Sequence, residues 1–368
     1  MQNSLDLLRT WIAEQGIDAY MVTQPQNRSY LTGWLNDDAE GSGIVFVSQQ
    51  QQVLLTNSLY KEVAEEKAAG WQVVVPPPEK REYGATIVEL AREHGWQKIG
   101  FEADIVTVAE YDKLRAAGEN VFTLQAFEKS YVNELRKVKQ PRELELLRKA
   151  IAITDETFAH ICQWIQPGMT EKQVKWEILR VMVELGADEP SFEPIVASGP
   201  NGTMPHAVPG SRQIQLGELI TIDMGARYQG YCADMTRTIC LGEPREPRMR
   251  EVYDTVLKAM KTCEAGLSGG MQGKAADALA RDVLEEAGLA DYYIHSTGHG
   301  VGLQIHEGPG LSQRSPDDAL LPVGTVVTVE PGVYIPDWTG TRVEDCVLIT
   351  EHGCEVLTQS STELVLPR

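Results

Sequence analysis

Apolar and polar residues recur with two different periods along the first third of the chain. Four segments have the helical spacing of apolar residues, namely residues 5–15, 59–69, 85–94 and 107–117. Five short apolar runs are typical of strands, namely residues 17–22, 43–47, 53–56, 73–75 and 98–102. Strands that alternate with helices predict a small layered α/β domain.

The pattern changes near residue 130, where a charged segment is interrupted by Pro141. Long helical periodicity then covers residues 143–165. Beyond it we expect mostly strands, with further helices at residues 171–186, 247–265 and 273–287. We therefore divide the chain into an N-terminal domain, residues 1–130, and a second domain, residues 131–368. A length of 368 residues agrees with two domains at roughly 150 residues each.

Charge and cysteine usage narrow the classes of protein. The chain has 33 basic and 53 acidic residues and a net charge of −20, which disfavours binding to nucleic acid. No apolar run approaches the roughly 18 residues of a membrane span, and no secretory signal is visible. The six cysteines show no CxxC pair and indicate reduced thiols. We therefore expect a cytoplasmic protein without a membrane or nucleic-acid partner.

Two aspartates lie on neighbouring predicted strands. Asp223 belongs to residues 217–226, Asp234 belongs to residues 231–239, and turn-like residues 227–230 connect the strands. The midpoint of the two aspartates falls inside this turn. A hairpin closed there would set the carboxylates opposite each other, roughly 5 Å apart. Opposed carboxylates repel unless a cation lies between them, although a single acidic pair is usually a solvated surface.

Two glutamates repeat this design later in the chain. Glu330 ends a predicted strand at residues 325–330, and Glu344 lies in a predicted strand at residues 342–349. Their midpoint is residue 337, within the connection, so the two side chains can face each other. Arg342 shares the face of Glu344 by period-2 alternation. Two hairpins of one design favour a functional site over a solvated surface.

A glycine-rich segment, residues 294–307, adds imidazole groups. Three of the seven histidines, His295, His299 and His306, lie within it. The glycines between them would let the backbone come close to whatever the histidines contact. Taken alone, the segment could also be a glycine-rich loop with incidental histidines. Four carboxylates and one imidazole suit a pair of divalent ions, and they favour manganese or cobalt over thiolate-bound structural zinc.

These stretches closely resemble the metallopeptidases of the pita-bread fold, the family of methionine aminopeptidase, aminopeptidase P and prolidase. The matching stretches follow in order as residues 217–225 (GELITIDMG), 234–238 (DMTRT), 298–307 (GHGVGLQIHE), 329–335 (VEPGVYI) and 340–345 (GTRVED). Residues 25–33 and 135–150 also resemble the N-terminal domain and linker of Xaa-Pro peptidases. Methionine aminopeptidases lack that domain. The resemblance implies a creatinase-like N-terminal α/β domain followed by a pita-bread catalytic domain.

The resemblance also implies a ligand set. Asp223 would bind one ion, and His299 with Glu330 would bind the other. Asp234 and Glu344 would bridge the two ions. The implied cofactor is two divalent metal ions, manganese first, with cobalt or zinc as alternatives. Because the family commonly dimerises, we also expect a homodimer.

Four further positions match residues around the substrate. His206 would face the substrate, and His306 would hydrogen-bond the scissile carbonyl, where both can stabilise developing charge. His295 and Arg342 match positions near the leaving group and the metals. Glu330 is the expected proton carrier to the leaving nitrogen. A proline-containing peptide, whose Xaa-Pro bond lacks an N–H group, requires such a dedicated site.

The length of the peptide is the open question. Many prolidases of the family have an arginine soon after the His-Glu pair, where it can clamp a dipeptide carboxylate, whereas this chain has Gly310 there. We therefore expect aminopeptidase P-like release of the N-terminal residue from proline-second peptides, with prolidase activity on dipeptides as the alternative. A non-peptide hydrolase or lyase on the same fold is a further alternative. A metal-free binding module is disfavoured because all five ligands are present.

Overall fold

The computed structural model describes residues 4–35, 43–77 and 83–367, and the chain forms two compact units. Unit 1 is Met1–Arg136, and unit 2 is Lys137–Arg368. Within the described ranges, no helix is both long enough and apolar enough to cross a membrane.

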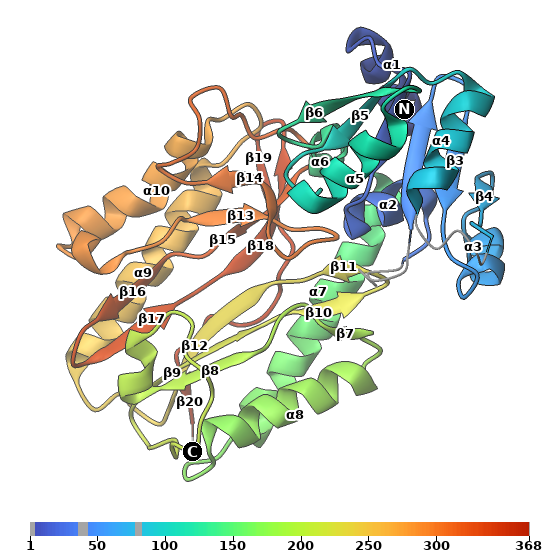
Figure 1. Ribbon diagram of the computed structural model, residues 1–368. Coiled ribbons are helices and arrows are strands. Elements are labelled where there is room, and N and C mark those ends of the chain that lie inside the picture. The colour runs from blue at the N-terminus through green and yellow to red at the C-terminus, as the bar shows by residue number, and fades with distance from the viewer. Residues whose placement is uncertain (1–3, 36–42, 78–82, 368) are drawn as a thin grey trace. The chain divides into compact units, whose positions relative to one another are not determined.

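Unit 1 is built on one six-stranded sheet with the order β4-β3-β2-β1-β5-β6 (Figure 1). The strands are β1 (Ala19–Val22), β2 (Ile44–Ser48), β3 (Gln52–Leu55), β4 (Gln72–Val74), β5 (Lys98–Glu102) and β6 (Thr123–Phe127). The helices are α1 (Ser4–Glu14), α2 (Pro25–Thr32), α3 (Lys61–Lys67), α4 (Tyr83–His94), α5 (Val108–Gly118) and α6 (Tyr131–Lys137). Strand β1 pairs antiparallel with β2 and parallel with β5, so the sheet is mixed.

Both faces of this sheet are buried. Tyr20 of β1 belongs to one core together with Leu8 of α1. The next residue, Met21, belongs to a second core together with Ile87 of α4. Because successive side chains point to opposite faces, a strand covered on both sides has a continuous apolar run, as the sequence of β1 does.

The sequence pattern did not predict three elements of unit 1, namely α2, β6 and α6. Helix α2 explains why a periodicity argument fails there. Its buried residues include Asn27, Arg28, Ser29 and Thr32, so the buried face is polar and has no apolar period. The helix ends at Gly33, whose φ of 73° is the left-handed conformation common after helices.

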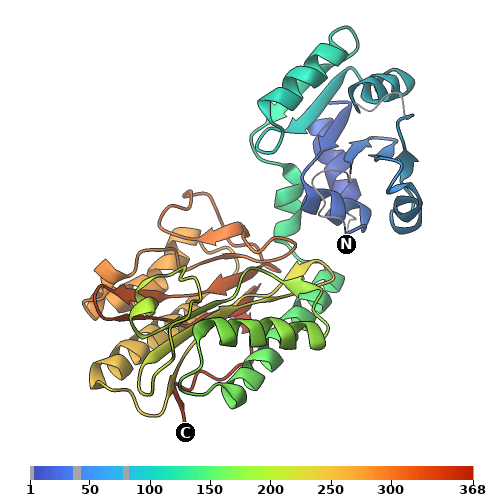
Figure 2. The same cartoon turned by 60° about the horizontal axis from the view of Figure 1, so that its bottom comes forward.

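Unit 2 has two helix pairs packed on largely antiparallel sheets (Figures 1 and 2). Its helices are α7 (Pro141–Trp164), α8 (Glu171–Glu184), η1 (Gly199–Thr203), α9 (Pro247–Gly266), α10 (Gly273–Glu286) and η2 (Ala290–Tyr292). A four-stranded sheet contains β8 (Ile195–Ser198), β9 (Leu219–Met224), β12 (Met235–Leu241) and β20 (Val365–Leu366). A five-stranded sheet contains β13 (Gly298–Gly300), β14 (Glu307–Leu311), β15 (Val326–Val329), β18 (Asp345–Thr350) and β19 (Gly353–Val356). The smaller sheets contain β7 (Glu189–Pro190), β10 (Ala226–Tyr228), β11 (Tyr231–Cys232), β16 (Gly332–Ile335) and β17 (Thr339–Arg342).

Each helix pair covers its own sheet. Ile178 of α8 and Ile222 of β9 belong to one apolar core, on the side of the green helices in Figure 1. Val256 of α9 and Val347 of β18 belong to another, on the side of the gold and orange helices. Each helix pair thus packs on an apolar sheet face, and the polar residues at the ends of the strands are not part of these two cores.

The first predicted hairpin has a different register from the one expected. Strands β9 and β12 pair with Asp223 opposite Thr236, so direct opposition of Asp223 and Asp234 was wrong. The turn consists of Gln229 and Gly230, whose φ values of 45° and 83° are both positive. Such a two-residue turn is centred one position later than the predicted midpoint and shifts the pairing by two residues. A shift of two preserves the face, since side chains alternate with period 2.

The second predicted hairpin has the expected register. Strands β15 and β18 pair Val329 with Asp345, and β16 pairs with β17 so that Gly332 is opposite Arg342. Both pairings are centred on Asp337, which has a φ of 58° at the turn. The predicted register around residue 337 is thus confirmed on both sides of Glu330 and Glu344.

Candidate metal centre and active site

Unit 2 encloses a cavity of about 690 Å³. The residues expected to form the site all line it, namely His206, Asp223, Asp234, His295, His299, His306, Glu330, Arg342 and Glu344. Apolar side chains, among them Phe192 and Ile305, line other parts of the wall. A concave site with apolar walls and a few convergent polar groups is typical of small-ligand binding.

The four carboxylates lie at the ends of strands. Asp223 is the second-last residue of β9, and Asp234 directly precedes β12. Glu330 directly follows β15, and Glu344 directly precedes β18. Asp223, Asp234 and Glu344 are buried, and Glu330 is partly buried. Strand pairing therefore holds four acids in the wall of one cavity.

His299 projects from β13 toward these acids. Its Nε2 lies 3.6 Å from Asp234 Oδ2 and 3.4 Å from Glu330 Oε1. Its Nδ1 lies 3.1 Å from the carbonyl oxygen of Gly300, which can only accept a hydrogen bond, so Nδ1 carries the proton. Burial, with nearby His306 adding to it, lowers the pKa of His299 to about 4. A neutral imidazole with its Nε2 lone pair directed at the acids is the form that binds a metal.

The glycines beside His299 allow close packing of neighbouring strands. A Cβ atom on Gly298 would lie 2.0 Å from the carbonyl oxygen of Thr328 in β15. A Cβ atom on Gly300 would lie 2.3 Å from the carbonyl oxygen of Gly308 in β14. Side chains at these positions would push the neighbouring strands away from β13. The predicted close approach of the backbone is thus seen here between neighbouring strands.

The acids fit a divalent cation. Asp223 Oδ1 and Glu344 Oε1 are buried and have no hydrogen-bond partner among the described residues. Burial first, and then repulsion by Glu344, raises the pKa of Asp234 well above its usual range. Burial likewise raises the pKa of Glu330 to about 8, although Arg342 works against the shift. One ligand atom each from Asp234, His299 and Glu344 lie within 4.8 Å of one another. Buried oxygens without donors, held this close, are what hard divalent ions require.

A chain of hydrogen bonds connects His295 to Asp223. Arg342 donates from Nη2 to Asp223 Oδ2 and from Nη1 to the hydroxyl oxygen of Tyr334, each at 2.5 Å. His295 Nδ1 lies 2.8 Å from the carbonyl oxygen of Ser296 and therefore carries a proton. Its Nε2 is then free to accept from the Tyr334 hydroxyl, 3.0 Å away. Burial lowers the pKa of His295 to about 4, which keeps the ring neutral.

His206 lies on the segment that follows η1, and Glu171 at the start of α8 holds this segment. Glu171 Oε1 accepts from the backbone N–H and the hydroxyl of Ser198, both at 2.8 Å. Asn201 Nδ2 donates to the same carboxylate at 3.0 Å, and the N–H of Gly210 donates at 3.2 Å. One buried side chain thus connects residues before and after His206.

Three residues of the site were not predicted from the sequence. Tyr334 connects His295 with Arg342, and Thr236 donates to Glu344 Oε2 at 2.7 Å. Glu171 is the third. Thr236 could have been found, since it is two positions after Asp234 and shares its strand face. Tyr334 and Glu171 could not, because each acts across a tertiary contact that no local spacing signals.

The site and fold have clear relatives. The metallopeptidase family M24 matches residues 145–351, and the Creatinase/Prolidase N-terminal domain matches residues 5–138. The chain is 34% identical over 366 residues to an Xaa-Pro dipeptidase of Pyrococcus furiosus, covering 99% of this chain and 100% of that one.

Solved structures agree with this match. An Xaa-Pro dipeptidase from Bacillus anthracis superposes with a TM-score of 0.92 at 38% identity, covering 98% of both chains. An X-Pro aminopeptidase from Thermotoga maritima superposes with a TM-score of 0.87 at 30% identity, covering 96% of this chain and 98% of that one. This chain therefore belongs to metallopeptidase family M24, as an Xaa-Pro hydrolase with a creatinase-like N-terminal domain and a pita-bread catalytic domain.

Proposed function

We propose that this chain is an Xaa-Pro dipeptidase that uses two divalent metal ions, with manganese as the expected metal. The observation that carries the proposal is the single cavity in which four acids and His299 converge while two buried carboxylate oxygens lack donors. Asp223 would bind one ion, His299 and Glu330 the other, and Asp234 and Glu344 both. Divalent ions in such a site supply Lewis acidity toward a carbonyl oxygen and lower the pKa of water.

The residues around the ions divide the remaining chemistry. The proline nitrogen has no hydrogen and must gain a proton to leave, and Glu330 lies in the cavity as the group that can transfer one. His206 and His306 line the same cavity and can donate hydrogen bonds to the carbonyl oxygen as charge develops on it. Arg342, through Asp223 and Tyr334, keeps this side of the cavity rigid.

Two features favour the dipeptide over a longer peptide. Relatives from Pyrococcus furiosus and Bacillus anthracis are both named Xaa-Pro dipeptidases, which favours the alternative that the sequence left open. Gly310, on which the aminopeptidase P-like expectation rested, is not among the described residues that line the cavity. Its lack of a side chain therefore carries little weight.

Lys175 of α8 is our candidate partner for the dipeptide carboxylate. Apart from Arg342, which already bonds Asp223 and Tyr334, it is the one Lys or Arg among the described lining residues. Its ammonium forms an ion pair with Glu193, whose side chain is 78% exposed. An exposed partner contributes little, so a substrate carboxylate can replace it.

Cleavage of Ala-Pro and Ala-Pro-Ala in parallel, with manganese added, tests the proposal. A dipeptidase cleaves Ala-Pro with the higher kcat/KM, whereas preference for the tripeptide would establish the aminopeptidase P-like activity. No cleavage of either peptide would refute both, and a non-peptide substrate would then be sought. The metal content of the purified protein, measured separately, tests the proposed two-metal centre.

Substitution of Lys175 sharpens the assay. Lys175→Met should raise the KM for Ala-Pro about tenfold or more, because a hydrogen bond to a charged group is worth about 1.5–3 kcal/mol. Glu193→Gln is the matched control and should leave the KM unchanged or lower. An equal rise of KM for both peptides would show that Lys175 does not bind the dipeptide carboxylate. The proposed metal centre would not be affected by that result.

A further inference from the structure

Arg237 occupies a position in β12 where the strand pattern calls for an apolar residue. Its neighbours by period-2 alternation, Met235 and Ile239, belong to the core beneath α7 and α8. The opposite face carries Thr236, which contacts Glu344. Arg237 is nevertheless 1% exposed and is the largest fully buried side chain of the described residues. Burial of a guanidinium is unfavourable unless every donor finds an acceptor.

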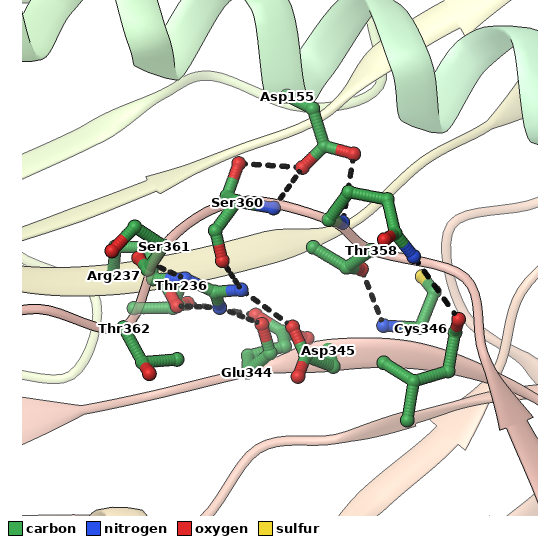
Figure 3. Close-up of polar contacts among 12 residues, drawn as sticks. Asp155, Thr236, Arg237, Glu344, Asp345, Cys346, Thr358, Ser360, Ser361 and Thr362 are labelled. Carbon is green, nitrogen blue, oxygen red and sulfur yellow. Dashed lines mark hydrogen bonds and ion pairs between the residues drawn. The ribbon is translucent and has the colours of Figure 1, made fainter.

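All five N–H groups of the guanidinium have acceptors (Figure 3). On the catalytic side, Nη1 donates to the carbonyl oxygen of Glu344 at 2.5 Å, and Nη2 donates to Asp345 Oδ1 at 2.6 Å. On the other side, Nη2 donates to the carbonyl oxygen of Ser360 at 2.9 Å, and Nε donates to that of Ser361 at 3.1 Å. The fifth donor bonds the carbonyl oxygen of Thr236, at 3.0 Å. Arg237 therefore joins β12, the Glu344 turn and the C-terminal segment.

These contacts hold Glu344 from both ends of its backbone. The N–H of Glu344 donates to the carbonyl oxygen of Thr236 at 3.0 Å, while its own carbonyl oxygen is bound by Arg237. Its side chain accepts from Thr236 Oγ1. Strand β12 also begins directly after Asp234. The separation of the two acids, Asp234 and Glu344, is thus set by one strand and by the guanidinium behind it.

The C-terminal segment is itself fixed. Asp155 of α7 accepts from the backbone N–H groups of Gln359 and Ser360, both at 2.9 Å, and from the Ser360 hydroxyl (Figure 3). Thr358 Oγ1 accepts from the N–H of Cys346 at 3.0 Å. The carbonyl groups that face Arg237 are therefore presented by a segment held at two other points.

We propose that Arg237 is a positioning residue for the metal centre, holding Glu344 in place against the C-terminal segment around Ser360 and Ser361. The inference rests on the proposed metal site and extends it to a part of the chain that contributes no ligand. Groups that orient metal ligands typically change metal affinity when they are removed.

A purely structural role would have a different signature. Arg237→Met removes one partner of a buried ion pair and leaves the Asp345 carboxylate uncompensated, so the metal-free variant should be less stable than the wild type. Arg237→Met keeps the apolar row of β12 continuous and removes the hold on Glu344. A positioning role predicts that the folded variant also binds the metal more weakly, whereas a purely structural role predicts lower stability with the metal affinity of the folded protein unchanged.

The experiment measures both quantities on the full chain. Manganese binding is followed by calorimetric titration, and unfolding is followed by urea titration in EDTA. Arg237→Met should weaken manganese binding by about 10- to 100-fold relative to the wild type. Asp345→Asn, which keeps the shape of the Arg237 partner and removes its charge, should weaken binding in the same direction and serves if the first variant does not fold.

A double-mutant cycle connects the effect to Glu344. In a Glu344→Gln background, Arg237→Met should produce little further loss of affinity, because the ligand it positions is already gone. Wild-type affinity in both Arg237→Met and Asp345→Asn would overturn the inference, as would a full additive loss in the cycle. Failure of the wild type to bind manganese, cobalt or zinc would instead overturn the proposed metal centre.

Discussion

Two groups of buried carboxylates in this chain differ in the donors that surround them. Glu102, at the end of β5 in unit 1, is 0% exposed and accepts from the N–H groups of Thr23 at 2.6 Å and Gln24 at 2.8 Å. Its other oxygen accepts from Asn27 Nδ2 at 2.7 Å. In unit 2, Asp223 and Glu344 each have one buried oxygen for which the described part of the chain supplies no donor.

The difference separates a structural acid from a metal-binding acid. A buried carboxylate must be compensated by hydrogen bonds, by a cation or by protonation. Glu102 is compensated by neutral donors of its own unit. The acids of the cavity lack enough donors, and burial with repulsion by Glu330 raises the pKa of Glu344 well above its usual range. Burial alone therefore does not distinguish Glu102 from the acids of the cavity, whereas the supply of donors does.

Glu344→Gln should have the largest effect on activity. The substitution removes a shared ligand, and we expect kcat/KM to fall by roughly 10³-fold or more, because metal ions stabilise the transition state by several kcal/mol. In EDTA, however, the variant should unfold at the same or a higher urea concentration, since an uncompensated acid has been removed. A large loss of metal-free stability would contradict the distinction between the two groups.

Glu102→Gln should lower the stability of the protein and leave its metal binding unchanged. Glu102→Gln places an amide NH2 against either the N–H groups of Thr23 and Gln24 or the amide of Asn27. An unsatisfied buried donor costs about 1–3 kcal/mol, so we expect that loss in the free energy of unfolding. Urea titration measures it, and manganese affinity of the folded protein should be unchanged. Unaltered stability would show that donors do not explain the burial of Glu102.

The acids of the cavity could be predicted from the sequence, whereas the buried site of Glu102 could not. Asp223 and Glu102 both end apolar strands, so neither looks different locally. The cavity acids were found because two acidic pairs recur at hairpin spacing and match known motifs. The partners of Glu102 lie in and before α2, a helix with a polar buried face that periodicity does not detect.

The registers of the two predicted hairpins also differ in how far the sequence could predict them. The pairing of Glu330 with Glu344 was predictable because the strand pairs on either side share one centre. The pairing around Asp223 depended on which residues adopt positive φ, and Gln229 is not an obvious choice. The partners of Tyr334 and Arg237 lie far away in the sequence, so local spacing does not identify them.

Glu171 extends the comparison to a compensated acid inside unit 2. Glu171→Gln would face the donors of Ser198, Asn201 or Gly210 with an amide NH2 and so loosen the segment that carries His206. We expect kcat/KM for Ala-Pro to fall roughly tenfold through misplacement of that group, with manganese affinity unchanged.

The control for Glu171 is a cycle with His206→Ala. If Glu171 acts through His206, then Glu171→Gln causes little further loss once the imidazole is absent. A fully additive loss, or a change in manganese affinity, would assign Glu171 to general stability or to the metal centre instead.

Glu177 on α8 pairs with His160 and Arg180 at the surface. Of the substitutions considered, Glu177→Gln should have the smallest effect on stability. Hydrogen bonds from Arg180, with His160 adding to them, lower the pKa of Glu177 from 4.5 to about 2. A lowered pKa means that the stabilisation is present above pH 4.5 and is lost as the pH falls toward 2. Because the partner side chains Arg180 and His160 are 48% and 39% exposed, solvent screens the pairs, and Glu177→Gln should cost only about 0.5 kcal/mol at neutral pH. Urea unfolding of both proteins at successive steps below pH 4.5 should show the difference shrinking, and a constant difference would mean that the Glu177 charge does not produce it.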